Sequence, residues 1–105
     1  MITLPPVKRT LYVERLEMAA APAAFEEAAR SGLVKQELDY SKALVEAGKL
    51  VLGGDFEDPV HGGLALLKAA TLAEARELSA TRPFVRAGLV RSSVLEWQVR
   101  YESPL

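Results

Sequence analysis

The order of strand-like and helix-like patterns constrains the fold of this chain more than any other feature of the sequence. A first strand is expected at Val7–Glu17 and a last one at Leu89–Tyr101, where apolar residues alternate with polar ones. Helical patterns and a central hairpin pattern lie between these two strands. The resulting order, βαββαβ, predicts an α+β fold of the ferredoxin-like sandwich type.

Helices are expected on both sides of the hairpin. Pro22 suits the first position of a short helix, although the sequence leaves open whether Pro22–Arg30 is a separate helix. A longer helix is expected at Leu33–Ala47, since Gly follows it as a stop signal. After the hairpin, Thr71 and Glu74 form a capping box, which begins the last helix.

The hairpin strands carry apolar residues on both faces of the expected sheet. Leu50–Phe56 and Leu64–Ala69 contain consecutive apolar residues, and neighbours along a strand point in opposite directions. The helices can cover only one face, so the other face needs a different partner. Exposure of that face costs roughly 1.5–3 kcal/mol for each large apolar side chain. The sequence therefore predicts a homodimer, or a larger homo-oligomer, in which a second sheet covers this face.

The composition is ordinary for a globular protein, and residues 1–105 are interpreted as a single domain. The formal net charge of −1 gives no field that attracts nucleic acid or an anionic membrane. The absence of cysteine excludes disulfides, thiol nucleophiles and thiolate metal ligands. No apolar run approaches the roughly 20 residues that span a bilayer, and Met1–Pro6 lacks a signal-peptide pattern. A cytoplasmic location is expected.

Three blocks of the sequence match one family of small α+β proteins. The blocks are Lys42–Leu50 (KALVEAGKL), Gly53-Gly54 and Pro83–Leu89 (PFVRAGL), and the spacing between them also fits. From about Leu11 to Trp97 the chain resembles the YciI-like (YCII-related) family, and it is more distantly similar to muconolactone isomerases. The resemblance implies a dimeric α+β barrel, with two sheets back to back and a small cleft between the helices and the sheet of each protomer.

Two positions depart from the pattern of that family. Its members carry a histidine near the start of the main helix and an aspartate just before the Pro-Phe block, and these two are the proposed acid–base pair. In this chain the two positions hold Glu37 and Arg82. A mechanism that rests on a His–Asp pair therefore cannot be transferred to this sequence.

Glu37 lies within the apolar face of its helix, between Ser41 and Leu44, at about 100° per residue. A carboxylate on such a face is unfavourable unless it is paired or protonated. Three hypotheses follow. In the first, Glu37 forms a structural ion pair with an arginine, and Arg82 is the best candidate. In the second, Glu37 is a catalytic acid–base group in a partly desolvated cleft, and in the third the helix is rotated and Glu37 is exposed.

The Pro-Phe block supplies the candidate substrate-binding residues. Arg82 and Arg86 are four residues apart and Arg91 is nearby, so the guanidinium groups can clamp a carboxylate through paired hydrogen bonds. Phe84 lies between the first two arginines and is assigned to the same site. The competing interpretation is that these arginines are solvated surface residues.

Tyr12 on the first strand and Tyr40 on the long helix can each place a hydroxyl at the cleft, so both are candidate catalytic residues beside Glu37. Their rings also suit a packed core, in which a buried tyrosine hydroxyl finds one partner. His61 is expected in an exposed hairpin loop, and it matches no metal-ligand spacing with the acidic residues near it. We therefore assign no metal and expect no cofactor.

Two classes of function fit these residues. The first is a small-molecule enzyme with the YciI-like fold, a cofactor-independent isomerase, lyase or dehalogenase-like protein. Its acid–base chemistry would take place in the cleft between the helices and the sheet, with Glu37 and Tyr12 or Tyr40. The alternative is a non-catalytic ligand-binding or assembly domain that has lost the His–Asp pair of the family.

Overall fold

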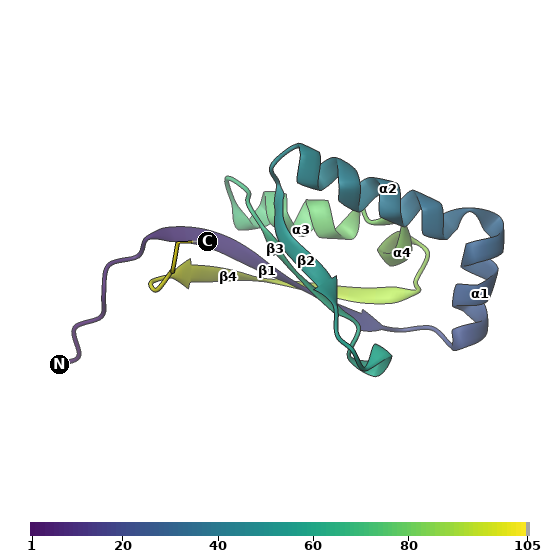
Figure 1. Ribbon diagram of the computed structural model, residues 1–105, viewed down its shortest axis with the longest axis horizontal. Helices are drawn as coiled ribbons and strands as arrows, with labels where there is room; N and C mark the ends of the chain where they lie inside the picture. The colour runs from purple at the N-terminus through teal and green to yellow at the C-terminus, as the bar shows by residue number, and fades with distance from the viewer. Residues whose placement is uncertain (105) are drawn as a thin grey trace.

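The structure is a computed structural model, and it describes residues 1–104. Figure 1 shows the arrangement of its helices and strands. In chain order, the elements of these residues are β1 (Arg9–Met18), α1 (Pro22–Ser31), α2 (Leu33–Glu46), β2 (Leu50–Asp55), η1 (Pro59–His61), β3 (Gly63–Leu67), α3 (Leu72–Ala80), α4 (Pro83–Arg86) and β4 (Val90–Val99). None of the helices in this part of the chain is both long and apolar enough to cross a membrane.

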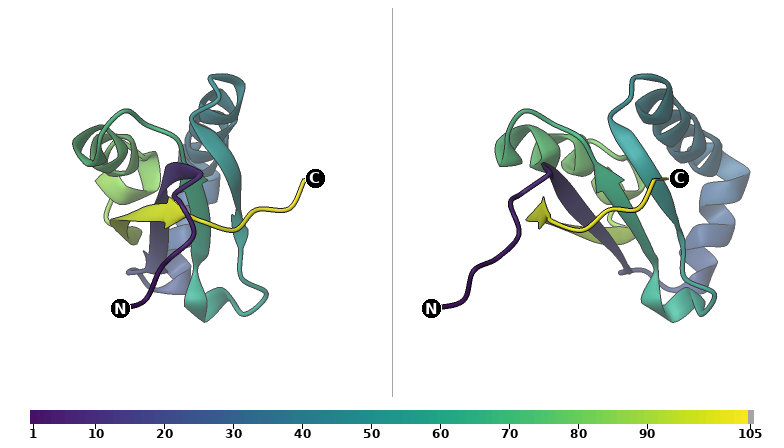
Figure 2. Two further views of the ribbon diagram at one scale, coloured as in Figure 1. Left: turned by 90° about the vertical axis from the view of Figure 1, so that its left-hand side faces the viewer. Right: turned by 60° about the vertical axis from the view of Figure 1, so that its left-hand side comes forward.

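Over the described residues, the strands form an antiparallel sheet in the order β2-β3-β1-β4. The two long strands β1 and β4 pair along their whole length, from Arg9 opposite Val99 to Met18 opposite Val90. Helices α2 and α3 both lie on one face of the sheet (Figure 1, Figure 2). The predicted α+β fold of the ferredoxin-like type is therefore confirmed.

The helix-facing side of the sheet carries the main core. Tyr12, Leu67 and Val94 point from the strands toward the helices, where Leu44 of α2 and Ala75 of α3 complete the cluster. Successive strand residues alternate between the two faces, so every second residue of a regular strand points toward the helices. Burial of each large apolar side chain contributes roughly 1.5–3 kcal/mol, and this packing sets the position of the helices on the sheet.

The helix boundaries settle one point that the sequence left open and add one short helix. Residues Pro22–Ser31 form a separate helix, α1, which ends at Gly32 in the left-handed conformation with φ 85°. Pro83–Arg86 forms the short helix α4, which was not among the elements expected from the sequence. A helix of a single turn is too short to show hydrophobic periodicity, which explains the difference.

The capping box at the start of α3 is present in a modified form. The Thr71 hydroxyl accepts a hydrogen bond from the backbone N–H of Glu74 over 3.1 Å, as predicted. The Glu74 carboxylate accepts from the backbone N–H of Ala70, over 3.3 Å, instead of reaching the N–H of Thr71. Both interactions satisfy donors at the N-terminal end of the helix.

The loop between β2 and β3 packs against the end of β1. Gly62 has φ 69°, and a Cβ atom at this position would overlap the carbonyl oxygen of Leu16. Only glycine fits both the positive φ and this close approach. His61 in the same loop is exposed, and its Nε2 lies 3.8 Å from the carboxylate of Asp58. Within residues 1–104, no group of three or more His, Asp or Glu residues is arranged to hold a metal ion.

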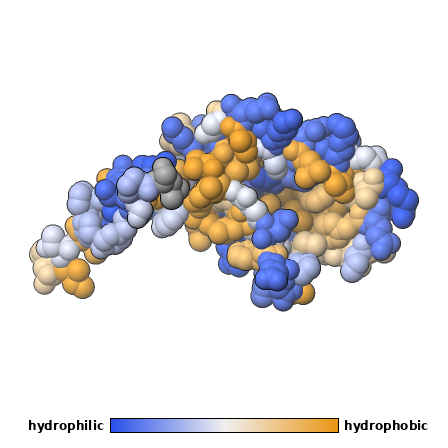
Figure 3. Space-filling view, viewed as in Figure 1, coloured by the Kyte–Doolittle hydropathy of each residue, from blue (hydrophilic) through white to orange (hydrophobic). Residues whose placement is uncertain are grey.

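The sheet face opposite the helices is apolar and exposed. The side chains of Leu52, Leu64, Leu95 and Trp97 on this face keep between 36% and 62% of their accessible surface. A shallow hollow of about 560 Å³ lies among several of them. Figure 3, viewed with β2 in front, shows hydrophobic residues over β2 and separately below α2, on the helix side of the sheet. Contiguous apolar surface of this kind is typical of interaction surfaces.

Candidate active site

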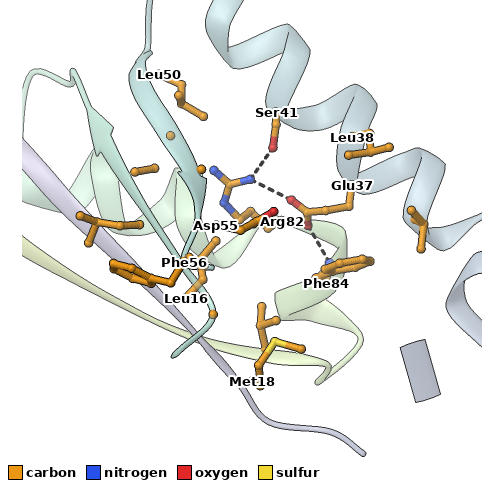
Figure 4. A pocket seen from close by; sticks show the side chains of 18 of the residues that line it. Leu16, Met18, Glu37, Leu38, Ser41, Leu50, Asp55, Phe56, Arg82 and Phe84 are labelled. Carbon is orange, nitrogen blue, oxygen red and sulfur yellow. Dashed lines mark hydrogen bonds and ion pairs between the residues drawn. The ribbon is translucent and has the colours of Figure 1, made fainter. Parts of the chain in front are cut away.

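A cavity of about 670 Å³ lies between α2, α4 and the helix-facing side of the sheet. Its lining is mainly apolar and includes the aromatic rings of Phe25, Phe56 and Phe84, and the last two are labelled in Figure 4. The charged or hydroxyl-bearing residues of the lining are Glu37, Ser41, Lys42, Asp55 and Arg82. A concave, apolar volume of this size with a few convergent polar groups is typical of small-molecule sites.

Arg82 forms a bidentate ion pair with Glu14, which lies behind the cavity lining. The Nε and Nη2 atoms of Arg82 donate to the two carboxylate oxygens of Glu14 over 2.7 and 2.8 Å. The hydroxyl of Ser79 donates to the same carboxylate. The side chains of Arg82 and Glu14 are 3% and 0% exposed, so both charges are withdrawn from water. A buried ion pair of this kind stabilises the fold only when both of its charges remain paired and hydrogen-bonded.

The same guanidinium group also holds Glu37. Its Nη1 donates to Oε2 of Glu37 and to the hydroxyl of Ser41, both over 2.8 Å. The other carboxylate oxygen of Glu37, Oε1, accepts from the backbone N–H of Phe84 over 3.0 Å. These contacts are the dashed lines of Figure 4. The carboxylate of Glu37 therefore belongs both to the buried network and to the wall of the cavity.

Local sequence places each member of this network. Glu37 and Ser41 lie one turn apart on the inward face of α2. Glu14 occupies an inward position of β1 by strand alternation. Arg82 precedes Pro83, and proline disfavours the helical conformation in the residue before it. Arg82 accordingly has φ −55° and ψ 134°, which separates α3 from α4.

Burial and the charges of the network alter the pKa of Arg82 and of the neighbouring Tyr40. Burial lowers the pKa of Arg82, but the hydrogen bonds and negative charges of Glu14 and Glu37 outweigh it, so the pKa is raised. The ring of Tyr40 lies 5.7 Å from the guanidinium carbon of Arg82. Burial raises the pKa of Tyr40, and the positive charge of Arg82 opposes this effect. Both groups therefore keep their protons at neutral pH.

Comparison with known proteins identifies the family. The family model described as the YCII-related domain matches residues 12–98. The chain belongs to the YCII-related family. No curated protein sequence matches this YCII-related chain.

A solved structure with a similar fold is 5-chloro-2-hydroxyhydroquinone dehydrochlorinase (TftG) from Burkholderia phenoliruptrix AC1100, in complex with 2,5-dihydroxybenzoquinone. The two proteins have 19% sequence identity and a TM-score of 0.58, and the match covers 85% of this chain and 93% of that chain. At this identity the similarity supports the fold of the YCII-related chain and no particular activity.

The cavity of this YCII-related protein contains part of the predicted site. Glu37, Arg82 and Phe84 all line it. Of the hypotheses for Glu37, the ion pair with Arg82 is present in the structure. Exposure of Glu37 is excluded, since the residue is 8% exposed. The ion pair does not decide whether Glu37 also acts as an acid–base group.

Other predicted site residues lie outside the cavity lining. Tyr12 is 4% exposed and packs in the core, in agreement with the alternative interpretation. The hydroxyl of Tyr40 donates to the carbonyl oxygen of Leu78 over 2.7 Å. Arg86 is exposed on α4, away from the cavity lining. In the structure Arg82 turns inward to two glutamates while Arg86 faces solvent, so their guanidinium groups do not converge as the predicted carboxylate clamp requires.

Two members of the network were missed by the sequence-based prediction. Glu14 and Ser79 are 0% and 1% exposed, and neither was assigned to the site. A signal for Glu14 was available, because it lies two residues from both Tyr12 and Leu16 and therefore on the same face of the strand. A carboxylate thus interrupts the inward, otherwise apolar face. Ser79 offers no comparable signal, since serine is common on either face of a helix.

Replacement of Arg82 tests the network. We expect Arg82→Met to lower the free energy of unfolding by about 3–5 kcal/mol, because it leaves the carboxylates of Glu14 and Glu37 buried without their cation. The matched control is Arg86→Met, an exposed site on α4, which should change the free energy of unfolding by less than about 0.5 kcal/mol. Urea denaturation of the variants measures both values. Equal, small losses in the two variants would contradict the network.

Proposed function

We propose that this YCII-related protein is a cofactor-independent enzyme that moves a proton on a small apolar molecule, with Glu37 as the acid–base group. The observation that carries the proposal is a buried carboxylate on the wall of an apolar cavity. Each carboxylate oxygen can accept more than one hydrogen bond. Arg82 occupies one position on Oε2 and the N–H of Phe84 one on Oε1. Acceptor capacity therefore remains for a molecule in the cavity.

The surroundings of Glu37 support proton transfer in two ways. Arg82, itself anchored by Glu14, fixes the orientation of the carboxylate before a ligand binds. A fixed orientation reduces the reorganisation that accompanies a proton transfer. Glu37 is itself only 8% exposed and lies beside apolar lining residues, so its charge acts in surroundings of lower dielectric constant than water.

The structural neighbour suggests a first compound to test. It is named as a dehydrochlorinase of 5-chloro-2-hydroxyhydroquinone. Loss of hydrogen chloride requires removal of a proton and departure of chloride, and a carboxylate base can take the proton. A hydroxylated aromatic ring also suits a cavity with the side chains of Phe25, Phe56 and Phe84 in its lining.

The second candidate function is a non-catalytic ligand-binding domain. The observation that favours it is the ion pair of Glu37, since a carboxylate that holds Arg82 in place already has a structural role. The chain also carries Glu37 and Arg82 where the resemblance implied a His–Asp pair. In this case the cavity would bind the molecule without changing it.

The variant Glu37→Gln distinguishes the two functions. With 5-chloro-2-hydroxyhydroquinone as substrate, we expect the wild-type protein to release chloride, and Glu37→Gln to do so at least about 100-fold more slowly. The matched control is Glu46→Gln, at the exposed C-terminal end of α2, which should keep the wild-type rate. Chloride release equal in both variants would contradict the proposed role of Glu37. Binding without chloride release by the wild type would favour the second function.

We also propose that the exposed sheet face forms a homodimer interface. The face presents side chains from three strands, with Leu52 on β2, Leu64 on β3, and Leu95 and Trp97 on β4. Two copies of this face are self-complementary in chemistry, because apolar surface meets apolar surface across a twofold axis. Sheets pack face to face about 10 Å apart, which allows the side chains of both copies to interdigitate.

A charge placed on this face should separate the subunits. We expect Leu95→Glu to shift the protein from dimer to monomer in analytical ultracentrifugation, because two copies would bury carboxylates without partners. Val60→Glu, at an exposed position in η1, introduces the same charge away from the face and should remain dimeric. A monomeric wild-type protein at micromolar concentration would contradict the proposed interface.

A further inference from the structure

The buried network beside the cavity carries an excess of negative charge. All oxygens of the Glu14 and Glu37 carboxylates accept hydrogen bonds from N–H or O–H donors. This is the pattern of two ionised carboxylates, since a protonated carboxyl group donates through its O–H. Arg82 is the guanidinium group that pairs with both of them. Two negative charges against one positive charge leave the cluster with a net charge of −1.

Arg82 is not available to a ligand anion. Its Nε and Nη2 donate to Glu14, and its Nη1 donates to Glu37 and Ser41. A ligand carboxylate would have to displace one of these acceptors and would lie beside the like charge of Glu37. Like charges in a desolvated site repel strongly. The part of the network that a ligand can meet is therefore a hydrogen-bond acceptor.

The remaining charged groups of the lining do not change the net negative charge beside the cavity. Lys42 and Asp55 line the cavity with opposite charges, and both residues are exposed. Their contributions are screened by water and largely cancel. The rings of Phe25, Phe56 and Phe84 in the lining add no positive charge that would attract a carboxylate.

We infer that the cavity selects an apolar ring compound whose polar group donates a hydrogen bond to Glu37, a protonated amine or a hydroxyl, and that it rejects carboxylates. The inference rests on the proposed function for the location of the site, and adds the charge and hydrogen-bonding character of the ligand. It replaces the carboxylate substrate that the spacing of Arg82 and Arg86 suggested.

Three compounds with the same ring system test the inference. They are 2-naphthylmethylamine, 2-naphthalenemethanol and 2-naphthoate, a cation, a neutral donor and an anion at pH 7. We expect dissociation constants from ¹H–¹⁵N NMR titration of the wild-type protein to rise in that order. Naphthoate should bind on the order of tenfold more weakly than the alcohol, as one unit of net charge beside the site implies. Naphthoate that binds as tightly as the other two, or more tightly, overturns the inference.

Two variants locate the source of the preference. In Glu37→Gln the buried cluster loses its excess charge, so the difference between amine and naphthoate should shrink to about threefold or less. In Asp55→Asn the preference should persist, because that carboxylate is exposed. A preference that disappears in Asp55→Asn and survives in Glu37→Gln overturns the assignment to Glu37.

The outcomes also separate this inference from the proposed enzyme. Ordered binding of the three compounds without any chloride release supports the charge preference and removes the enzymatic function. Chloride release together with tight naphthoate binding supports the enzymatic function and overturns the charge preference. If none of the three compounds binds, the inferred ligand class is overturned, whereas the proposed enzyme is still judged by chloride release alone.

Discussion

The guanidinium group of Arg82 joins parts of the chain that are far apart in the sequence. It holds β1 through Glu14 and α2 through Glu37, and it lies itself at the junction of α3 and α4. A buried cation requires these partners, since an unpaired charge in the protein interior is strongly destabilising. The position of α2 over the sheet therefore depends on Arg82 as well as on apolar packing. The cavity wall, which α2 and α4 help to form, depends on the same interactions.

These interactions also determine what the cavity can do. The donors of Arg82 are directed to groups of the protein itself, so the cation that sequence reasoning assigned to a substrate has a structural role. The group that it leaves facing the cavity is the carboxylate of Glu37. A site built in this way offers a fixed acceptor in apolar surroundings. Both the proposed proton transfer and the preference for hydrogen-bond donors follow from that one feature.

Much of the fold could be predicted, because strand alternation, the cap at Thr71 and the element order are local or repetitive signals. The contact between Glu37 and Arg82 could also be predicted, since a carboxylate on an apolar helix face needs a cation. The i, i+4 spacing of Arg82 and Arg86 does not bring their side chains together, because proline after Arg82 gives that residue an extended backbone. Glu14 was missed because a lone charged residue in a strand usually faces solvent.

The most direct test is hydrogen exchange at the arginine side-chain Nε–H groups, measured by NMR in the wild type and in Glu14→Gln. The Nε–H of Arg82 donates to a carboxylate that is 0% exposed, so it should exchange far more slowly than that of the exposed Arg86. Its protection should fall in Glu14→Gln, because the charge-assisted bond is replaced by a weaker one. An Arg82 Nε–H that exchanges as fast as that of Arg86 would contradict the buried network and the cavity built on it.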